Sequence, residues 1–115
     1  MNNLLETNKI EVRFYVGLGQ DCNGQWITAS EADIMREQMR TVLAATFEGV
    51  TEYAHHGVWA DAETRPVSEY GITCVTIIDE DQRFFVEPTA QNLKRIARQS
   101  CVLVTAARVS AHFVA

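Results

Sequence analysis

One ten-residue segment constrains the fold of this chain more than any other part of it. In residues 9–18, every second side chain is apolar without a break. Such alternation places successive side chains on opposite faces of a β-strand. The apolar face consists of Ile10, Val12, Phe14, Val16 and Leu18. We therefore expect a strand that buries this face and turns Glu11, Arg13 and Tyr15 the other way.

A helix is expected to follow, after a glycine-rich turn over residues 17–24. Thr28 and Glu31 have the spacing of a capping box, which is typical of the start of a helix. Farther along, apolar residues recur every three or four positions, which is the period of one helix face. They are Ile34, Met35, Met39, Val42, Leu43 and Phe47. Gly49 marks the expected end of this helix.

A hairpin of two strands is predicted in the middle of the chain. Residues 51–59 favour a strand, although the adjacent pair His55 and His56 interrupts the alternation. Residues 61–66 are polar and end in Arg-Pro, which is typical of a turn. Residues 71–78 are rich in β-branched side chains and favour the returning strand.

The C-terminal part predicts a second helix and a last strand. The helix is expected to open at Pro88, with Thr89 as its cap. Residues 83–87, just before it, indicate either a returning strand or an irregular lead into the helix, and both alternatives stay open. Residues 101–114 read as a final strand of 14 residues, well above the usual five or six.

This order of elements predicts an α+β ferredoxin-like βαββαβ sandwich, an antiparallel sheet with two helices on one face. In that topology the first and last strands are neighbours, so we expect Arg13 and Tyr15 to lie near Arg108 and His112. The opposite sheet face is expected to be uncovered. Domains of this kind often cover the bare face by dimerising, or extend the last strand into a neighbour. We therefore predict a homo-oligomer, a dimer or a larger assembly.

Length and composition agree with one folded domain. A chain of 115 residues without a repeat or linker suggests a single α+β domain over residues 1–115. Hydrophobic residues make up 47% of the chain and charged ones 22%, which argues against disorder. The net charge is −5 and the basic residues are dispersed, so we expect no nucleic-acid partner.

The chain carries no sequence signal for a membrane or a secretory route. No apolar run is long enough to span a bilayer, and the first residues lack a basic and then apolar pattern. We expect a cytoplasmic protein with no membrane partner. The three cysteines are widely spaced and odd in number, so reduced thiols are expected. They are Cys22, Cys74 and Cys101.

No motif with a defined chemistry is present. The loop Gly19-x-x-x-x-Gly24 resembles a phosphate-binding loop, but the lysine that should follow it is absent. His55 and His56 point to opposite faces of a strand, so they cannot bind one metal ion together. A zinc site would need one of them with His112 and a carboxylate brought in by folding. We expect no metal and no cofactor, and no nucleophile signature is recognisable.

Candidate ligand-binding residues gather around the face that we expect to be uncovered. Trp59 either covers an end of the core or forms a stacking wall for a flat ligand. The same two alternatives apply to Trp26. A histidine there is also a candidate general base near neutral pH. The candidate site residues are Arg13, Tyr15, His55, Trp59, Arg108 and His112.

Three short segments carry a resemblance to a known group of proteins. They are Arg13-Phe-Tyr-Val-Gly-Leu-Gly, Phe47-Glu-Gly-Val and Gly57-Val-Trp59, followed by the predicted hairpin. The chain resembles a family of small bacterial and phage domains of unknown function with ferredoxin-like topology. The resemblance implies the fold and carries no functional residue across. Cofactor-independent monooxygenases of the dimeric α/β-barrel type share the topology, but none of their motifs is found here.

Three hypotheses on function follow. The first is a noncatalytic oligomeric protein that binds a small aromatic or anionic ligand at the uncovered sheet face or between subunits. The second is a small cofactor-independent oxygenase-like or isomerase-like enzyme that uses a histidine base. The third is a phage or mobile-element accessory protein that inhibits a host protein, for which copurification with a partner would be decisive.

Overall fold

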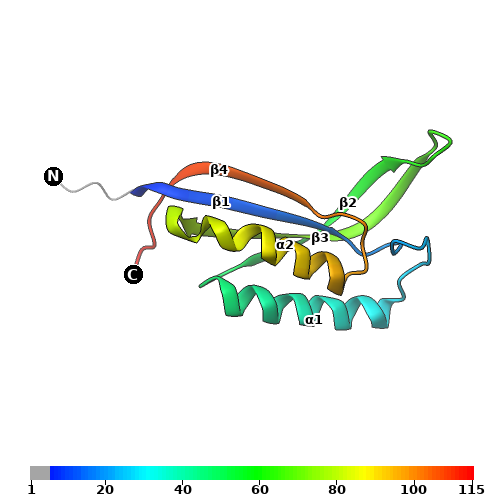
Figure 1. Cartoon of the computed structure of the whole chain (residues 1–115), viewed down its shortest axis with the longest axis horizontal. Helices are drawn as coiled ribbons and strands as arrows, with labels where there is room; N and C mark the ends of the chain where they lie inside the picture. Colours follow the sequence, from blue (N-terminus) through cyan, green and yellow to red (C-terminus); the bar gives the residue numbers. More distant parts are fainter. Residues whose placement is uncertain (1–5) are drawn as a thin grey trace.

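The sheet has four antiparallel strands in the order β2-β3-β1-β4, and two helices pack on one of its faces (Figure 1). This arrangement is seen in a computed structural model, which describes residues 6–115, with side chains from residue 8. The elements are β1 (Glu6–Gly17), α1 (Ala29–Thr46), β2 (Thr51–Ala60), β3 (Pro66–Asp79), the 3-10 helix η1 (Glu80–Phe85), α2 (Val86–Ile96) and β4 (Leu103–Ala111). The predicted ferredoxin-like βαββαβ fold is confirmed.

The core lies between the sheet and the helices, as the alternation over residues 9–18 predicts. The apolar face of β1 is buried against Met39 and Leu43 of α1 and Leu93 of α2. Helix α1 begins where its capping box places it. The Thr28 hydroxyl accepts the Glu31 backbone N–H at 3.1 Å, and the Glu31 carboxylate accepts the Thr28 N–H at 3.0 Å. Burial agrees with the predicted apolar stripe of α1 at Met35, Met39 and Leu43, but Ile34, which was expected on the same stripe, is 60% exposed.

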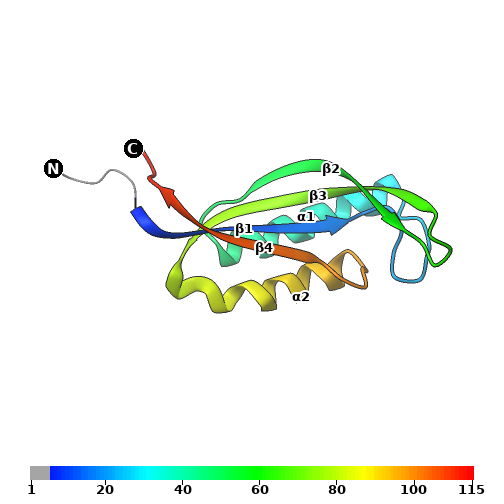
Figure 2. The ribbon, with the colours of Figure 1, turned by 90° about the horizontal axis from the view of Figure 1, so that it is seen from above.

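The opposite face of the sheet carries neither helix, as Figure 2 shows together with Figure 1. The strand register places Tyr15 between Leu103 of β4 and Thr73 of β3, with Tyr53 of β2 beyond. Leu103 is 60% exposed and Tyr53 is 48% exposed. The predicted bare sheet face is therefore present, and it is partly apolar.

The start of the second helix differs from the prediction. Residues 83–87 are helical, since η1 runs directly into α2 at Val86. Pro88 fits inside the first turn of α2 because backbone N–H groups there have no partner within the helix. Thr89 does not act as the cap, because its hydroxyl donates to the Phe85 carbonyl within the helical segment, at 2.7 Å.

The last strand is shorter than predicted. It covers Leu103–Ala111, nine residues, rather than residues 101–114. Its ladder partner is β1, and the pairing runs from Tyr15 with Leu103 to Glu6 with Ala111. The strand therefore ends where the described part of β1 ends. An unusual strand length thus no longer supports extension into a neighbouring subunit.

The hairpin of β2 and β3 projects beyond the rest of the sheet (Figure 1). The pairing of β1 with β3 stops at Gly17 and Gly71, whereas β2 and β3 remain paired out to Ala60 and Pro66. The outer part of the hairpin, residues 56–69, is therefore a two-stranded arm. Its turn is closed by Asp61, whose carboxylate accepts the Glu63 and Arg65 backbone N–H groups.

Among the described residues, 6–115, no helix has the length and apolar character needed to cross a membrane.

Candidate functional site

A carboxylate lies directly over two glycines at the end of β1. The side chain of Glu69, from β3, occupies the space that a side chain at Gly17 or Gly19 would need. A Cβ atom at Gly17 would be 1.9 Å from Glu69 Oε1, and one at Gly19 would be 2.6 Å from Glu69 Cγ. The Gln20 backbone N–H also donates to the carboxylate, at 3.4 Å. The glycines thus permit a close approach that fixes the position of this charge.

A histidine lies beside this carboxylate over a third glycine. A Cβ atom at Gly71 would be 2.6 Å from His55 Nε2 and 2.5 Å from the Val16 carbonyl oxygen. His55 Nδ1 is hydrogen-bonded to the Thr73 hydroxyl at 2.8 Å. Burial lowers the pKa of His55 below its usual value of 6.5, although the charge of Glu69 opposes this shift. The imidazole is therefore neutral near pH 7.

Tyr15 completes the group on the uncovered sheet face. Its ring centroid is 6.1 Å from that of His55. We call Tyr15, His55 and Glu69, with the glycines beneath them, the glycine cradle. It combines an anionic carboxylate, a neutral imidazole and an aromatic ring. Such a set can attract a cation, accept a proton and contact a flat or polarizable group.

Two of the predicted site residues, Tyr15 and His55, therefore lie side by side. Arg13 adjoins them, since its guanidinium also interacts with the Tyr15 side chain, and Trp59 lies farther along the same face. Arg13 is two residues before Tyr15 on β1, and its guanidinium donates to Glu11 at 2.7 Å. Trp59 is four residues after His55 on β2, where it is 44% exposed and paired with Val67 in the arm. A role for Arg13 or Trp59 in ligand binding stays a prediction.

Arg108 and His112 are not where the sequence placed them. Arg108 pairs with Ile10, so it lies on the helix-bearing face, where its guanidinium contacts Glu80 at 3.0 Å. His112 follows the last residue of β4, at the opposite end of the strand from Leu103, which pairs with Tyr15. The prediction that both lie near Tyr15 is wrong, because the faces of β4 were assigned in reverse.

Glu69 was missed by the sequence reasoning. It lies outside residues 71–78, where the sequence predicts the strand, whereas β3 begins at Pro66. The sequence does carry one indication of this site, the glycines Gly17, Gly19 and Gly71 in and beside two predicted strands. A glycine in a strand often marks a place where another group approaches the backbone closely. The sequence does not say which side chain makes that approach.

A second feature lies at the loop between β1 and α1, on the helix-bearing side of the sheet. Trp26 is 64% exposed there, so it does not cover the core. Beside it is a hollow of about 490 Å³ between the loop, α1 and β3. It is lined in part by Leu18, Gly19, Trp26, Asp33, Arg36 and Tyr70.

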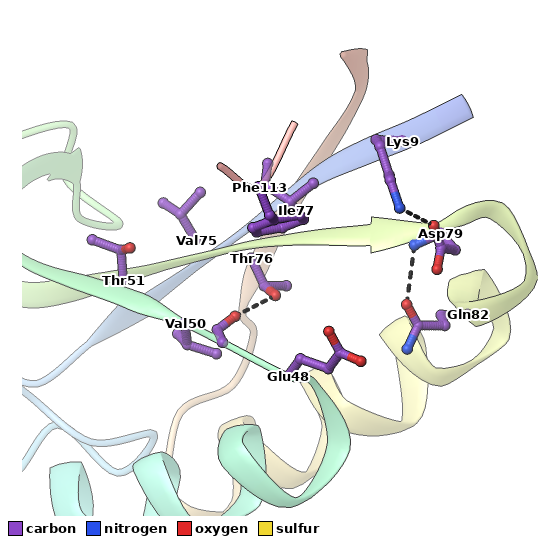
Figure 3. Close-up of a pocket in the computed structure, with 11 residues that line it drawn as sticks. Lys9, Glu48, Val50, Thr51, Val75, Thr76, Ile77, Asp79, Gln82 and Phe113 are labelled. Atoms are coloured by element: carbon purple, nitrogen blue, oxygen red, sulfur yellow. Dashed lines mark hydrogen bonds and ion pairs between the residues drawn. The ribbon is translucent and has the colours of Figure 1, made fainter. Parts of the chain in front are cut away.

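Another hollow, of about 510 Å³, lies at the other end of β3 (Figure 3). Several of its polar groups are paired with each other, whereas Glu48 and Thr51 also line it. Lys9 contacts the Asp79 carboxylate, and the Asp79 backbone N–H donates to the Gln82 amide oxygen at 3.0 Å. The Thr76 hydroxyl donates to the Gly49 carbonyl at 2.7 Å.

Within residues 6–115, no group of three or more His, Cys, Asp or Glu side chains is arranged so that it could bind a metal ion. The cysteines in this part of the chain are not disulfide-bonded. Cys22 and Cys101 are exposed, and Cys74 is buried in the core.

No protein-family model matches the chain, and no curated protein matches it in sequence. Solved structures are similar in fold. A phage SAM lyase in complex with S-methyl-5'-thioadenosine has a TM-score of 0.68 and 15% identity, over 98% of this chain and 96% of that one. A phage SAM lyase in the apo state gives a TM-score of 0.66 and 16% identity, over 98% of this chain and 95% of that one.

CutA from Synechococcus elongatus is also similar, with a TM-score of 0.58 and 10% identity over 93% of this chain and 82% of that one. Identities this low show a shared fold and nothing beyond it. The chain is a small α+β domain with ferredoxin-like topology, and its likeness to known proteins is confined to that fold.

Proposed function

We propose that this protein, as a homo-oligomer, binds S-adenosylmethionine at the glycine cradle and cleaves it to S-methyl-5'-thioadenosine. The observation that carries the proposal is the Glu69 carboxylate, fixed on Gly17 and Gly19 beside a neutral His55. The similarity in fold to a phage SAM lyase over nearly the whole chain supports the choice of substrate.

The chemistry of the substrate matches the charges of the cradle. S-methyl-5'-thioadenosine keeps the adenosine, the sulfur and one methyl group of S-adenosylmethionine. A lyase that forms it must therefore break the bond between the sulfonium sulfur and the amino-acid chain. The sulfonium is cationic, so Glu69 attracts it and the face of the Tyr15 ring favours it.

The two titratable groups have different roles in this proposal. The positive charge on sulfur disappears as the bond breaks, so Glu69 stabilises the bound substrate more than the transition state. Glu69→Gln is expected to raise KM and to change kcat little. As the carbon–sulfur bond breaks, its electron pair stays on sulfur, and a C=C bond forms in the amino-acid chain as the neighbouring carbon loses a proton. His55, being neutral, is available to take that proton. His55→Ala is then expected to lower kcat by about a hundredfold or more.

The experiment incubates the purified protein with S-adenosylmethionine and measures S-methyl-5'-thioadenosine by liquid chromatography and mass spectrometry. Glu63→Gln is the matched control, because it removes a carboxylate in the hairpin turn, away from the cradle. If neither product nor retained substrate is detected, the proposal is wrong. If the substrate is retained intact, the protein belongs to the noncatalytic class of small-ligand binders.

The uncovered sheet face supports the oligomer. Leu103 and Tyr53 are exposed apolar groups there, and the two edge strands, β2 and β4, contain no lysine or proline. Unprotected edges and bare faces of this kind favour pairing between chains. Native mass spectrometry reports the subunit number. A monomer at micromolar concentration would argue against an assembly, and a copurified host protein would support the inhibitor hypothesis instead.

A further inference from the structure

The side chain of Gln99, in the connection between α2 and β4, is held in one orientation. Its amide nitrogen donates to the Gln20 carbonyl at 2.9 Å and to the Ala97 carbonyl at 3.1 Å. Both amide hydrogens are therefore used, and turning the amide over would place its oxygen against two carbonyl oxygens. The amide oxygen, Oε1, thus points away from these two carbonyls.

The backbone at this position is also fixed. Arg98 has a φ of 53°, in the left-handed region that residues other than glycine rarely adopt. Its carbonyl accepts the Cys22 backbone N–H at 2.7 Å, and its guanidinium pairs with Glu31 at 2.7 Å. The Gln99 backbone N–H then donates to the Lys94 carbonyl at 3.0 Å. A polar group held in this way binds a ligand at a low cost in conformational entropy.

The oxygen of this amide and the Glu69 carboxylate converge on Gly17. Gln99 Oε1 lies 3.1 Å, and Glu69 Oε1 lies 1.9 Å, from the position that a Cβ atom at Gly17 would take. The two oxygens are therefore close neighbours. One donor atom placed between them can lie within hydrogen-bond distance of both, since such distances are about 2.7–3.2 Å.

The two oxygens have no cationic donor of their own. Among residues 6–115, Gln99 Oε1 accepts no hydrogen bond, and Glu69 forms no ion pair and accepts only the Gln20 backbone N–H, at 3.4 Å. One carboxylate and one amide oxygen are too few for a hard divalent cation, which takes six or more oxygen ligands. A primary ammonium is compact, carries a positive charge and has several N–H donors, so it satisfies both oxygens at once.

We propose that the Glu69 carboxylate and the Gln99 amide oxygen together bind a primary ammonium group of the ligand, and we call this pair the ammonium site. The inference rests on the proposed function, because S-adenosylmethionine carries an α-ammonium group a short carbon chain away from its sulfonium. Tyr15 and Gly17 share one face of β1, so the sulfonium lies on the Tyr15 side of Glu69 and the ammonium on the Gln99 side. The protein therefore selects sulfonium compounds that carry an amine.

The experiment measures by calorimetry the binding of two probes that differ only in the amine. S-methylmethionine carries a sulfonium, a carboxylate and an ammonium group, and its deaminated counterpart, dimethylsulfoniobutanoate, lacks the ammonium. The wild-type protein is expected to bind S-methylmethionine about tenfold or more tightly, because hydrogen bonds between an ammonium and a carboxylate are strong. The ratio of the two dissociation constants measures this preference.

Gln99→Leu removes the amide oxygen and is expected to bring this ratio closer to one. The substitution also removes two hydrogen bonds to the backbone, but a structural loss weakens both probes alike and leaves the ratio unchanged. Glu69→Gln provides a second measurement that keeps those two bonds, and it is expected to lower the same ratio. Gln91→Leu is the matched control, because Gln91 is an exposed residue on α2. Thermal melts by circular dichroism check that each variant folds.

The outcomes separate this inference from the proposed function. If the wild-type protein binds the two probes equally, or binds neither, the ammonium site is wrong, even where S-adenosylmethionine is cleaved. If folded Gln99→Leu keeps the wild-type ratio, Gln99 takes no part and the inference is overturned as well. If the ratio depends on both Gln99 and Glu69 but S-adenosylmethionine is neither cleaved nor retained, the ammonium site stands and the proposed function fails.

Discussion

Replacing Gly71 with alanine tests the close packing that positions His55. The new Cβ would lie 2.5 Å from the Val16 carbonyl oxygen and 2.6 Å from His55 Nε2, and real Cβ contacts below 3.0 Å are essentially never seen. The imidazole can rotate away, but the carbonyl belongs to the backbone of β1. Relief therefore requires a shift between two paired strands.

The magnitude follows from two opposing effects. Overpacking of a well-packed site costs about 1–3 kcal/mol. Replacing a glycine by alanine in a compatible backbone conformation stabilises by about 0.4–1 kcal/mol through the unfolded state. Gly71→Ala is therefore expected to lower the free energy of unfolding by about 1–2 kcal/mol. Gly57→Ala is the matched control, since a Cβ there meets no atom within 4 Å. It is expected to leave stability unchanged or slightly higher.

Urea unfolding followed by circular dichroism gives both free energies, and an NMR titration gives the pKa of His55. Displacement of the ring into solvent removes the burial that lowers this pKa, so we expect Gly71→Ala to raise it toward 6.5. If Gly71→Ala unfolds at the same urea concentration as Gly57→Ala, with an unchanged pKa of His55, the packing argument is refuted.

Three further predictions concern other parts of the fold. Burial raises the pKa of the Cys74 thiol to about 11, so a thiol reagent at pH 8 should label Cys22 and Cys101 in the native protein and Cys74 only after unfolding. Burial lowers the pKa of His55 in the folded state, so on acidification the imidazole is protonated in the unfolded state before it is protonated in the folded state. The free energy of unfolding should therefore fall as the pH drops below 6.5. His55→Gln should weaken this dependence of the free energy on pH, as measured by urea unfolding at a series of pH values. Thr28→Ala removes one half of the capping box and should lower the free energy of unfolding by about 0.5–2 kcal/mol in the same assay.

The fold was predictable because its main signals are local. The alternation over residues 9–18 and the capping box at Thr28 depend on neighbours in sequence, and both agree with the structure. The order of elements then restricts the topology, since crossovers are right-handed and connections are short. The sequence predicts the start of α2 at Pro88, two residues later than its start at Val86, because a proline fits anywhere in the first turn and so does not mark the first residue.

The site was only partly predictable because its residues come from three strands. Tyr15 and His55 meet as the sequence suggested, but the faces of β4 were reversed. Along that strand apolar and small residues occur on both faces, so the hydrophobic pattern does not fix which side is buried. Arg108 was therefore placed beside Tyr15, whereas the pairing with Ile10 turns it toward the helices.

The two-stranded arm formed by residues 56–69 has a consequence for how the protein opens. It has no third strand beside it, and a lone hairpin is only marginally stable in water. Its amides should therefore exchange with deuterium before those of the central strands, through opening of the arm alone. Glu69 lies at the base of this arm and His55 precedes it directly. A molecule that binds Glu69 and holds it in place would slow the deuterium exchange of the arm. Occupancy of the cradle should therefore be measurable from the exchange rates of amides at the tip of the hairpin.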